Sequence, residues 1–296
     1  MIYDVCVIGG GPAGMFSTFY SASRRLNTVL IEGNHELGGR LNLFLNYEIY
    51  DIPGQFGVLA CDYKQALIEQ LKVSKANVLL GEIVEKIEYI DELFYVTTTQ
   101  QTILAKTIIA ATGNGFSEAK RIEHAHNSKK IQYDTPAFKQ YDGPIAVIGH
   151  TPMAADWAIQ LMGYGNAVTL YTDQELNLQS ILMDGLVNNN IPVYNFVDFN
   201  DKAYKAVFCH IGSKKRTIDF KGRIKQRDNG LTNFSGYFVA GDARYEQGKL
   251  KLIQGATHDA MQAVNAAFQY IHEGANYQPI VSTHDPIFKE WVKEAY

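Results

Sequence analysis

Short apolar runs alternate along the chain with glycine-rich turns and with segments in which apolar residues recur at helical spacing. The apolar runs predict strands buried on both faces, as in parallel sheets; they lie at residues 3–8, 28–32, 106–111, 145–148, 167–171 and 236–241. The helical spacing predicts the main helices at residues 12–25, 152–161 and 256–272, with a short amphipathic helix at 289–296. This alternation of strands and helices is typical of an α/β fold with parallel sheets.

The strongest local signal is a glycine turn between the first strand and the first helix. Gly9, Gly11 and Gly14 form a G-x-G-x-x-G motif, and the second strand ends in Glu32. The first glycine permits a tight turn, the second lets the backbone approach a pyrophosphate, and the third lets helix and strand pack closely. The helix N-terminus presents N–H groups to phosphates. Because Glu32 can accept hydrogen bonds from a ribose 2′-OH, the motif predicts FAD or NAD.

Further features favour FAD over NAD. A further run of glycines, in the turn at residues 36–41, is suited to an extended ligand. The strand at 236–241 runs into Gly241-Asp242, where a carboxylate can bond the ribitol hydroxyls of a flavin. A helix that begins after Ile253 would direct the positive end of its dipole at the pyrimidine edge of the flavin. The alternative is that Asp242 only caps a turn.

Composition and charge exclude several classes of protein. With 296 residues, of which 46% are hydrophobic, the chain can form one large or two medium domains with sizeable cores. The net charge of −4 gives no reason to expect a nucleic-acid partner. No apolar run reaches the roughly 20 residues of a membrane span. Because the chain starts directly into a strand, without a leader pattern, we expect a cytoplasmic protein.

The three cysteines, Cys6, Cys61 and Cys209, lie singly in the sequence. Without a C-x-x-C pair we expect neither a disulfide framework nor a zinc site nor a dithiol redox centre. Each cysteine is better explained as a small packed hydrophobe. We therefore predict no metal site.

Several motifs in this order resemble those of the thioredoxin-reductase-like flavoproteins: G-G-G-P-A-G, L-G-G-R, I-Y-D-I-P-G, A-T-G-N-G and G-D-A-R-Y-E-Q-G-K-L-K-L-I. Within that group, residues 245–271 and the tail Q-P-I-V-S-T-H-D-P-I-F are similar to the bacterial ferredoxin/flavodoxin–NADP+ reductases. The resemblance covers nearly the whole chain.

The resemblance implies an α/β fold of two Rossmann-like, doubly wound nucleotide-binding domains, the second inserted in the first. An FAD-binding domain would take residues 1–116 and 230–296, and a pyridine-nucleotide-type domain residues 117–229. The resemblance also implies a homodimer in which the C-terminal tail of one subunit covers the flavin of the other. Flavodoxin or ferredoxin would be the redox partner.

Site residues follow from the resemblance by position. Glu32 would bind the FAD ribose and Asp242 the ribitol. Arg40 would stand where the family usually has glutamine, and Phe44 would lie on the isoalloxazine. No catalytic side chain is predicted.

Three further positions would complete the flavin site. Val84 would contact the adenine, Phe116 would belong to the surroundings of the flavin, and Thr283 in the tail would contact the flavin ring. The other predicted cofactor-binding residues lie in the motifs quoted above: Gly9, Gly11, Pro12, Ala13, Gly14, Gly39, Asp51, Ala111, Thr112, Gly113, Gly241 and Ile253.

The sequence departs from thioredoxin reductases in one decisive place. Those of this size carry a C-x-x-C in the inserted domain, whereas the stretch between Gly113 and Asp242 contains only Cys209. Reduction of a disulfide by that mechanism needs two thiols and is excluded. Electrons would therefore leave the flavin directly, to a carrier at the exposed edge of its ring.

The second glycine turn, at residues 147–161, is also altered. Gly149 and Ala154 are present, but Thr151 replaces the middle glycine, where a pyrophosphate must come close. After the next strand, Tyr171-Thr172-Asp173 replaces the His-Arg-Arg cluster with which the family clamps the 2′-phosphate of NADPH. An aspartate repels that phosphate but accepts from a free 2′-OH, unless it only caps a turn. The sequence leaves NADPH, NADH and no nucleotide open at this turn.

Two functions are compatible with the sequence: an FAD-dependent oxidoreductase that exchanges electrons with a small redox protein, and a non-enzymatic FAD protein such as a redox sensor or assembly partner. Seven basic residues between Lys214 and Arg227 predict either a surface that steers an acidic redox protein or a solvated hairpin. In the tail, Val281 stands where the family often has a flavin-stacking histidine. His284 could take over that role or be exposed.

Overall fold

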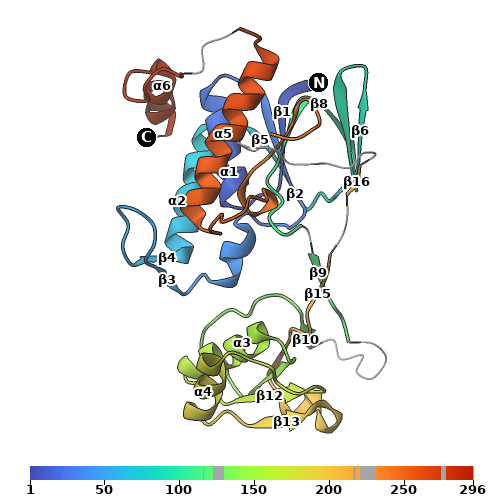
Figure 1. The fold of residues 1–296 in the computed structure, drawn as a ribbon. Helices are drawn as coiled ribbons and strands as arrows, with labels where there is room; N and C mark the ends of the chain where they lie inside the picture. The colour runs from blue at the N-terminus through green and yellow to red at the C-terminus, as the bar shows by residue number, and fades with distance from the viewer. Residues whose placement is uncertain (116, 123–129, 216–217, 221–230, 275–277, 296) are drawn as a thin grey trace. The chain divides into compact units, whose positions relative to one another are not determined.

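The chain folds into two units, which are described separately. The computed structural model describes residues 1–115, 117–122, 130–215, 218–220, 231–274 and 278–295. Unit 1 consists of Met1–Phe116 and Thr217–Tyr296, and unit 2 of Ser117–Arg216 (Figure 1). The sequence had placed the return to the first domain at residue 230. In the structure, the pairing of Asp219 and Phe220 with Lys86 and Ile87 already belongs to the sheet of unit 1.

A mixed, twisted sheet is the centre of unit 1. Its described strands are β1 (Ile2–Ile8), β2 (Thr28–Glu32), β5 (Asn77–Leu80), β6 (Val84–Ile90), β7 (Leu93–Thr98), β8 (Thr102–Ala110), β16 (Asp219–Phe220) and β17 (Tyr237–Val239). Their order is β16-β6-β7-β8-β1-β2-β5, and β17 also pairs with β8. β1 pairs in parallel with β2 and β8, and β8 with β17, whereas β7 is antiparallel to both its neighbours. The carboxyl ends of β1, β2, β8 and β17 therefore meet at one edge.

Helices cover one face of this sheet. They are α1 (Pro12–Ser23), α2 (Ala60–Val73) and α5 (Ile253–Ile271), which lie side by side in Figure 1, and α6 (Pro286–Ala295) follows near the C-terminus. Two short 3₁₀ turns, η1 (Gly39–Leu43) and η5 (Gly241–Ala243), and a hairpin of β3 (Glu48–Ile49) and β4 (Val58–Leu59) complete the unit. Val7, Leu30 and Ile109 of the sheet pack with Ala263 and Val264 of α5 in a fully buried core.

Unit 2 repeats the architecture on a smaller scale. Its described elements are β9 (Ser117–Ala119), β10 (Ile131–Gln132), β11 (Ile145–Ile148), α3 (Pro152–Gly163), β12 (Val168–Thr172), α4 (Ser180–Asn188), β13 (Val193–Asn195), η2 (Phe196–Asp198), η3 (Asp201–Ala203), β14 (Ala206–Cys209) and β15 (Ser213–Lys215). A parallel sheet has the order β10-β14-β11-β12-β13, while β9 and β15 form a separate antiparallel pair. Trp157 of α3 is fully buried against this sheet.

The α/β fold with two Rossmann-like units is confirmed. The strands and helices expected from the hydrophobic pattern are all present, with shifts at their ends. α5 begins at Ile253, three residues before the expected start, because the extended Leu252 precedes it. α6 likewise begins earlier than expected, at Pro286, a favourable residue in a first helical turn.

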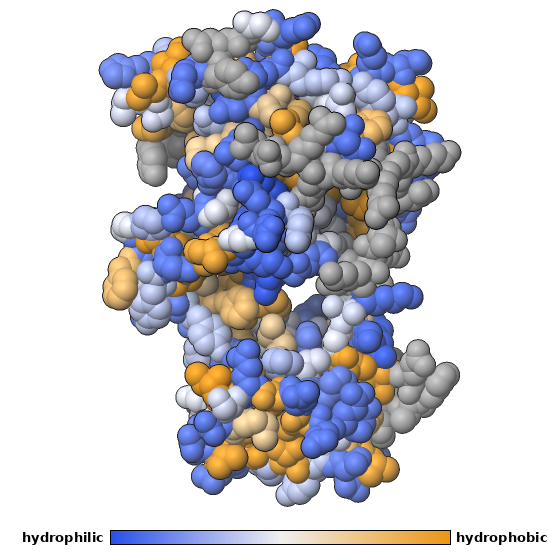
Figure 2. All heavy atoms as spheres, in the orientation of Figure 1, coloured by the Kyte–Doolittle hydropathy of each residue, from blue (hydrophilic) through white to orange (hydrophobic). Residues whose placement is uncertain are grey.

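Hydrophobic and hydrophilic residues are interspersed over the face of the molecule drawn in Figure 2. Among the described residues, no helix is long and apolar enough to cross a bilayer.

The C-terminal helix packs on its own chain. Phe288 and Trp291 of α6 lie with their ring centroids 6.1 and 5.7 Å from that of Phe19 in α1. Just before α6, the buried carboxylate of Asp285 accepts two hydrogen bonds from the guanidinium of Arg25, at 2.7 and 3.2 Å, and a third from the N–H of Ile287. This ion pair joins the start of α6 to the end of α1.

Asp285→Asn tests that attachment. Hydrogen bonds from Arg25 lower the pKa of Asp285, so the ion pair stabilises the fold above the pKa of about 3.9 of an unfolded aspartate. That contribution is lost as the pH falls through the lower pKa of the folded state. Because Arg25 is about half exposed, we expect a loss of about 1 kcal/mol at pH 7, seen as a Tm lower by roughly 2 °C. In thermal melts, the difference from wild type should shrink below pH 4; a difference constant down to pH 2 contradicts the assignment.

Candidate functional site

Three backbone segments converge on the turn between β1 and α1. A Cβ on Gly14 would lie 1.7 Å from the carbonyl oxygen of Gly9, and one on Gly9 would lie 2.5 Å from that of Ala111. Gly9 also has a φ of +106°, which disfavours any other residue. The fold itself therefore requires Gly9 and Gly14.

Gly11 is different. A Cβ built on it would have only the Cα of Gly39 nearby, at 3.8 Å, and its φ of −75° suits any residue. No side chain caps the N-terminus of α1, where Pro12 supplies no N–H. The next N–H groups, of Ala13 and Gly14, therefore have no capping side chain among the described residues. These uncapped N–H groups fit the pyrophosphate of a dinucleotide.

Glu32 lies beside this turn at the end of β2. Its buried carboxylate accepts a 2.5 Å hydrogen bond from the N–H of Gly10, and further bonds from the backbone and side-chain N–H groups of Asn34, at 2.7 and 2.8 Å. These bonds hold both oxygens in place. Since each oxygen can accept more than one hydrogen bond, the carboxylate can still accept from a ribose hydroxyl.

The glycine turn at residues 36–41 lies against the turn between β1 and α1. The N–H of Gly38 donates to the carbonyl of Gly10 at 2.9 Å, and Gly39 approaches Gly11 so closely that a Cβ would lie 2.9 Å from its Cα. The next residue, Arg40, places its guanidinium 3.5 Å from the carboxylate of Asp242 in η5. The structure thus brings together two of the charged residues that the sequence assigned to the cofactor.

The remaining predicted residues of unit 1 divide into two groups. Thr112 and Gly113 follow β8 directly at the carboxyl edge, and Gly241 packs on Ala13. Val84, by contrast, is the first residue of β6 and is buried in the core on the other face of the sheet. The partly buried Ile253 opens α5, the exposed Phe44 follows η1, and Phe116 lies outside the described residues.

Two predicted residues lie away from the turn. Asp51 is exposed in the loop between β3 and β4. Thr283 is exposed just before α6, which is attached near Arg25, beyond the end of α1. The 12 residues of α1 separate Arg25 from Gly11 by about 18 Å, so Thr283 does not join the flavin site of its own chain.

A buried ion cluster supports η5, and sequence reasoning missed it. The carboxylate of Asp259 in α5 accepts from the N–H of Gly241 at 3.1 Å and from the guanidinium of Arg244 at 2.7 Å. The ammonium of Lys249 bonds both this carboxylate and the carbonyl of Gly241. Asp259 thereby fixes the backbone that carries Asp242. The sequence did hold a signal for this cluster: Asp259 is a charged residue on the face of α5 that otherwise carries small apolar residues.

In the second glycine turn, which lies in unit 2, the hydroxyl of Thr151 hydrogen-bonds to groups of the same unit. Thr151 precedes α3, and its Oγ1 accepts the N–H of Ala154 at 3.2 Å. The same hydroxyl donates to the carbonyl of His210 at 2.9 Å and lies 2.7 Å from the Nδ1 of that ring. Burial lowers the pKa of His210, which favours its neutral form. Thr151 therefore joins α3 to the end of β14.

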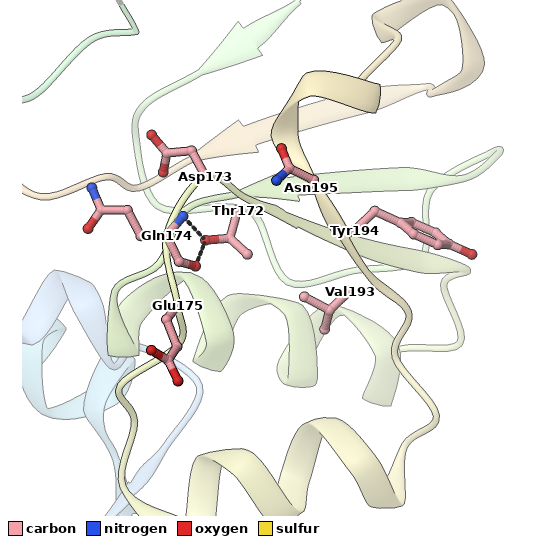
Figure 3. A pocket seen from close by; sticks show the side chains of 7 residues that line it. All are labelled: Thr172, Asp173, Gln174, Glu175, Val193, Tyr194 and Asn195. Atoms are coloured by element: carbon pink, nitrogen blue, oxygen red, sulfur yellow. Dashed lines mark hydrogen bonds between the residues drawn. The ribbon is translucent and has the colours of Figure 1, made fainter.

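A shallow hollow of about 390 Å³ lies at the carboxyl ends of β12 and β13 (Figure 3). Its lining residues are Thr172, Asp173, Gln174, Glu175, Val193, Tyr194 and Asn195. The hydroxyl of Thr172 is engaged with the backbone of Gln174, and the Nδ1 of His150 lies 3.6 Å from the Asp173 carboxylate. Asp173 and Glu175 give this place a negative charge, which disfavours a phosphate.

Within the described ranges, no three His, Cys, Asp or Glu side chains are arranged to hold a metal ion.

Comparison with known proteins agrees with this architecture. Residues 59–190 match the family model described as pyridine nucleotide-disulphide oxidoreductase. The fold is similar to that of Lactococcus lactis thioredoxin reductase, with a TM-score of 0.66 and 24% identity over 92% of this chain and 99% of that one. The thioredoxin reductase of T. acidophilum gives a TM-score of 0.67 at 18% identity, over 93% and 99% of the two chains. The chain thus resembles the thioredoxin-reductase-like flavoproteins in its fold and in the family model that it matches.

Its curated relatives narrow the class. A protein of Lysinibacillus sphaericus named ferredoxin–NADP reductase 3 is 29% identical, over 98% of this chain and 95% of its own length. A ferredoxin–NADP reductase of Lactococcus lactis subsp. cremoris is also 29% identical, over 89% and 92% of the two chains. The protein is an FAD-dependent oxidoreductase that resembles the ferredoxin–NADP reductases.

Gly11→Val tests the place of the cofactor. Since the chain leaves room at this position, the variant should fold, but its side chain would fill the space of the pyrophosphate. We expect purified Gly11→Val to lack the yellow flavin absorbance while keeping the far-ultraviolet circular dichroism of the wild type. Gly14→Ala is the contrasting variant, because its Cβ would collide with Gly9 and should destabilise the fold itself. Full flavin content in folded Gly11→Val would refute the site.

Proposed function

We propose that the protein passes electrons between FAD bound at the first glycine turn and a small redox protein of the ferredoxin or flavodoxin type. The observation that carries the proposal is an open dinucleotide cradle in a chain whose thiols are isolated from one another. The names of the relatives support a ferredoxin-type partner. They also favour an enzyme over the alternative of a non-enzymatic FAD sensor.

The thiols are unsuited to redox exchange. Cys6 and Cys209 are fully buried, Cys6 in the core of unit 1 and Cys209 in that of unit 2, and burial raises the pKa of each to about 12. Burial also raises the pKa of the partly exposed Cys61. Because the thiolate is the reactive form, none of the three is poised to attack a disulfide.

When bound, FAD supplies a two-electron redox centre that can exchange electrons one at a time. The chain's own residues bind and orient it: the α1 N-terminus would hold the pyrophosphate and Glu32 the adenosine ribose. Asp242, positioned through Asp259, would bond the ribitol. Arg40 partly neutralises Asp242 at the same place, and it brings a positive charge to the site at which an acidic carrier would dock.

A homodimer belongs to the proposal. Thr283 is distant from the first glycine turn of its own chain, so a contact with flavin would have to be made in a partner subunit. The basic run that would steer the carrier is described only in part: Lys214 is exposed in β15, whereas Arg216 and residues 221–227 lie outside the described residues.

The absence of a thiol mechanism is tested with Cys6→Ala, Cys61→Ala and Cys209→Ala combined. Alanine avoids placing an unpaired hydroxyl in the core. We expect the folded, FAD-loaded triple variant to keep the flavin reduction and reoxidation rates of the wild type within about twofold, and neither protein to reduce thioredoxin. Loss of flavin redox activity in a folded triple variant would reveal a thiol step.

Rapid mixing tests the proposed function directly. Reduced ferredoxin and reduced flavodoxin should each bleach the flavin absorbance, and the rate should fall as salt is raised because the encounter is steered by charge. Arg40→Glu should slow the reaction with the acidic carrier. Arg40→Lys keeps the charge and should remain close to wild type. Failure of both carriers to exchange electrons with an FAD-loaded protein would overturn the proposal.

A further inference from the structure

The two glycine turns have the same backbone but different chemistry. Gly11 and Thr151 each precede a helix that begins with proline, and both are extended, with φ and ψ of −75° and −176° for Gly11 and of −82° and 155° for Thr151. Both turns follow a strand, β1 or β11, that pairs in parallel with a neighbour on each side. The turns differ in several side chains, and at the position of Gly11 and Thr151 the difference adds a hydroxyl that makes bonds of its own.

Each turn keeps the glycine that the fold demands. A Cβ on Gly149 would lie 2.2 Å from the carbonyl oxygen of His210, just as one on Gly9 would lie 2.5 Å from that of Ala111. The middle glycine is not demanded in this way, because a Cβ on Gly11 would meet only the Cα of Gly39, at an ordinary contact distance of 3.8 Å. Only a group from outside the chain requires the absence of a side chain there. Unit 2 has thus kept the structural glycine and lost the one that a ligand requires.

The hydroxyl of Thr151 takes up the hydrogen-bonding capacity of the second turn. The N–H of Ala154, whose counterpart in α1 is that of Gly14, donates to Oγ1. The hydroxyl proton is given to the carbonyl of His210, and the Nδ1 of the same ring is within hydrogen-bond distance of Oγ1. A hydroxyl has one proton to donate and two positions that accept. In the neutral tautomer of His210 that carries its proton on Nδ1, the Thr151 hydroxyl therefore uses its proton and both acceptor positions. Pro152 contributes no N–H to the turn.

We infer that Thr151 closes the second glycine turn to nicotinamide nucleotides, its hydroxyl standing in for the phosphate oxygen that such a turn would otherwise bind. This inference rests on the proposed function and specifies which site of the protein carries it: unit 1 is the redox site, and unit 2 supplies no dinucleotide. Asp173 alone would discriminate only against a 2′-phosphate. Thr151 acts on the pyrophosphate, which NADH and NADPH share, and therefore excludes both.

Binding measurements on the FAD-loaded full-length protein test this without any electron transfer. NAD+ and NADP+ are titrated by calorimetry into the wild type, Thr151→Ser, Thr151→Ala and Thr151→Gly. Glycine replaces threonine at a helix N-cap at a cost of only a few tenths of a kcal/mol, so the glycine variant should fold. Circular dichroism and flavin content verify the fold of each variant.

We expect Thr151→Gly to bind NAD+ on the order of 10- to 100-fold more tightly than wild type, since an N–H bond to a charged phosphate is regained and its space cleared. Thr151→Ser keeps the hydroxyl and should stay within about twofold of wild type. Thr151→Ala removes the hydroxyl and should gain in part. The inference is overturned if wild type already binds either nucleotide as tightly as Thr151→Gly does, or if Thr151→Gly and Thr151→Ser bind alike.

These outcomes are separate from those of the proposed function. Exchange of electrons with reduced ferredoxin or flavodoxin depends on unit 1 and should be the same in all four proteins. If the carriers fail in all four while the binding series behaves as expected, the proposed function is wrong and the assignment of Thr151 stands.

Discussion

The close approach of backbone at the carboxyl edge of the first sheet is the constraint on which the site depends. α1 can pack on β1 only because Gly14 has no side chain to meet the carbonyl of Gly9, and Gly9 in turn leaves room for Ala111. That packing fixes the direction of α1, whose N-terminal N–H groups have no capping side chain among the described residues. Glu32 and Gly38 are held beside the same turn by hydrogen bonds to one residue, Gly10. A dinucleotide site follows from the packing of glycines.

Charge is handled differently in the two halves of that site. Around Glu32, a buried carboxylate is stabilised by neutral N–H donors and keeps capacity for a further donor. Around η5, the carboxylate of Asp259 is saturated by two cations and a backbone N–H. A buried carboxylate without partners lowers the stability of the fold, and removal of one member of the cluster would leave a buried charge uncompensated. The first arrangement leaves a group for the ligand, whereas the second holds a segment in place.

The two units illustrate how one architecture separates from one function. Both place a strand, a turn and a proline-initiated helix in the same way, and both retain the glycine that prevents a backbone collision. In unit 2 the space before the helix is filled by a hydroxyl that binds His210, whose ring lies edge-on to the buried Trp157. The hollow at the carboxyl ends of β12 and β13 is lined by two acids, Asp173 and Glu175, and by no arginine. Unit 2 therefore has the fold of a nucleotide-binding domain, whereas the side chains at its turn do not match those of such a domain.

Local patterns in the sequence were enough to identify the α/β class, the first dinucleotide turn and the absence of a dithiol, because these depend on periodicity, on glycines at fixed spacing and on a count of cysteines. It also singled out Thr151 and Asp173 as departures. It could not show that Arg40 meets Asp242 or that Asp259 supports Gly241, since these partners are brought together only by the crossing of distant segments. It placed Val84 at the adenine by position; the fold shows that this side chain is buried in the core, and the assignment stays a prediction. The role of Thr151 was likewise decided by tertiary structure: its hydroxyl finds His210, 59 positions further along the chain, because β14 lies beside β11 in the sheet. Local patterns state which groups are present, and only the packed chain decides which of them are already satisfied and which remain for a ligand.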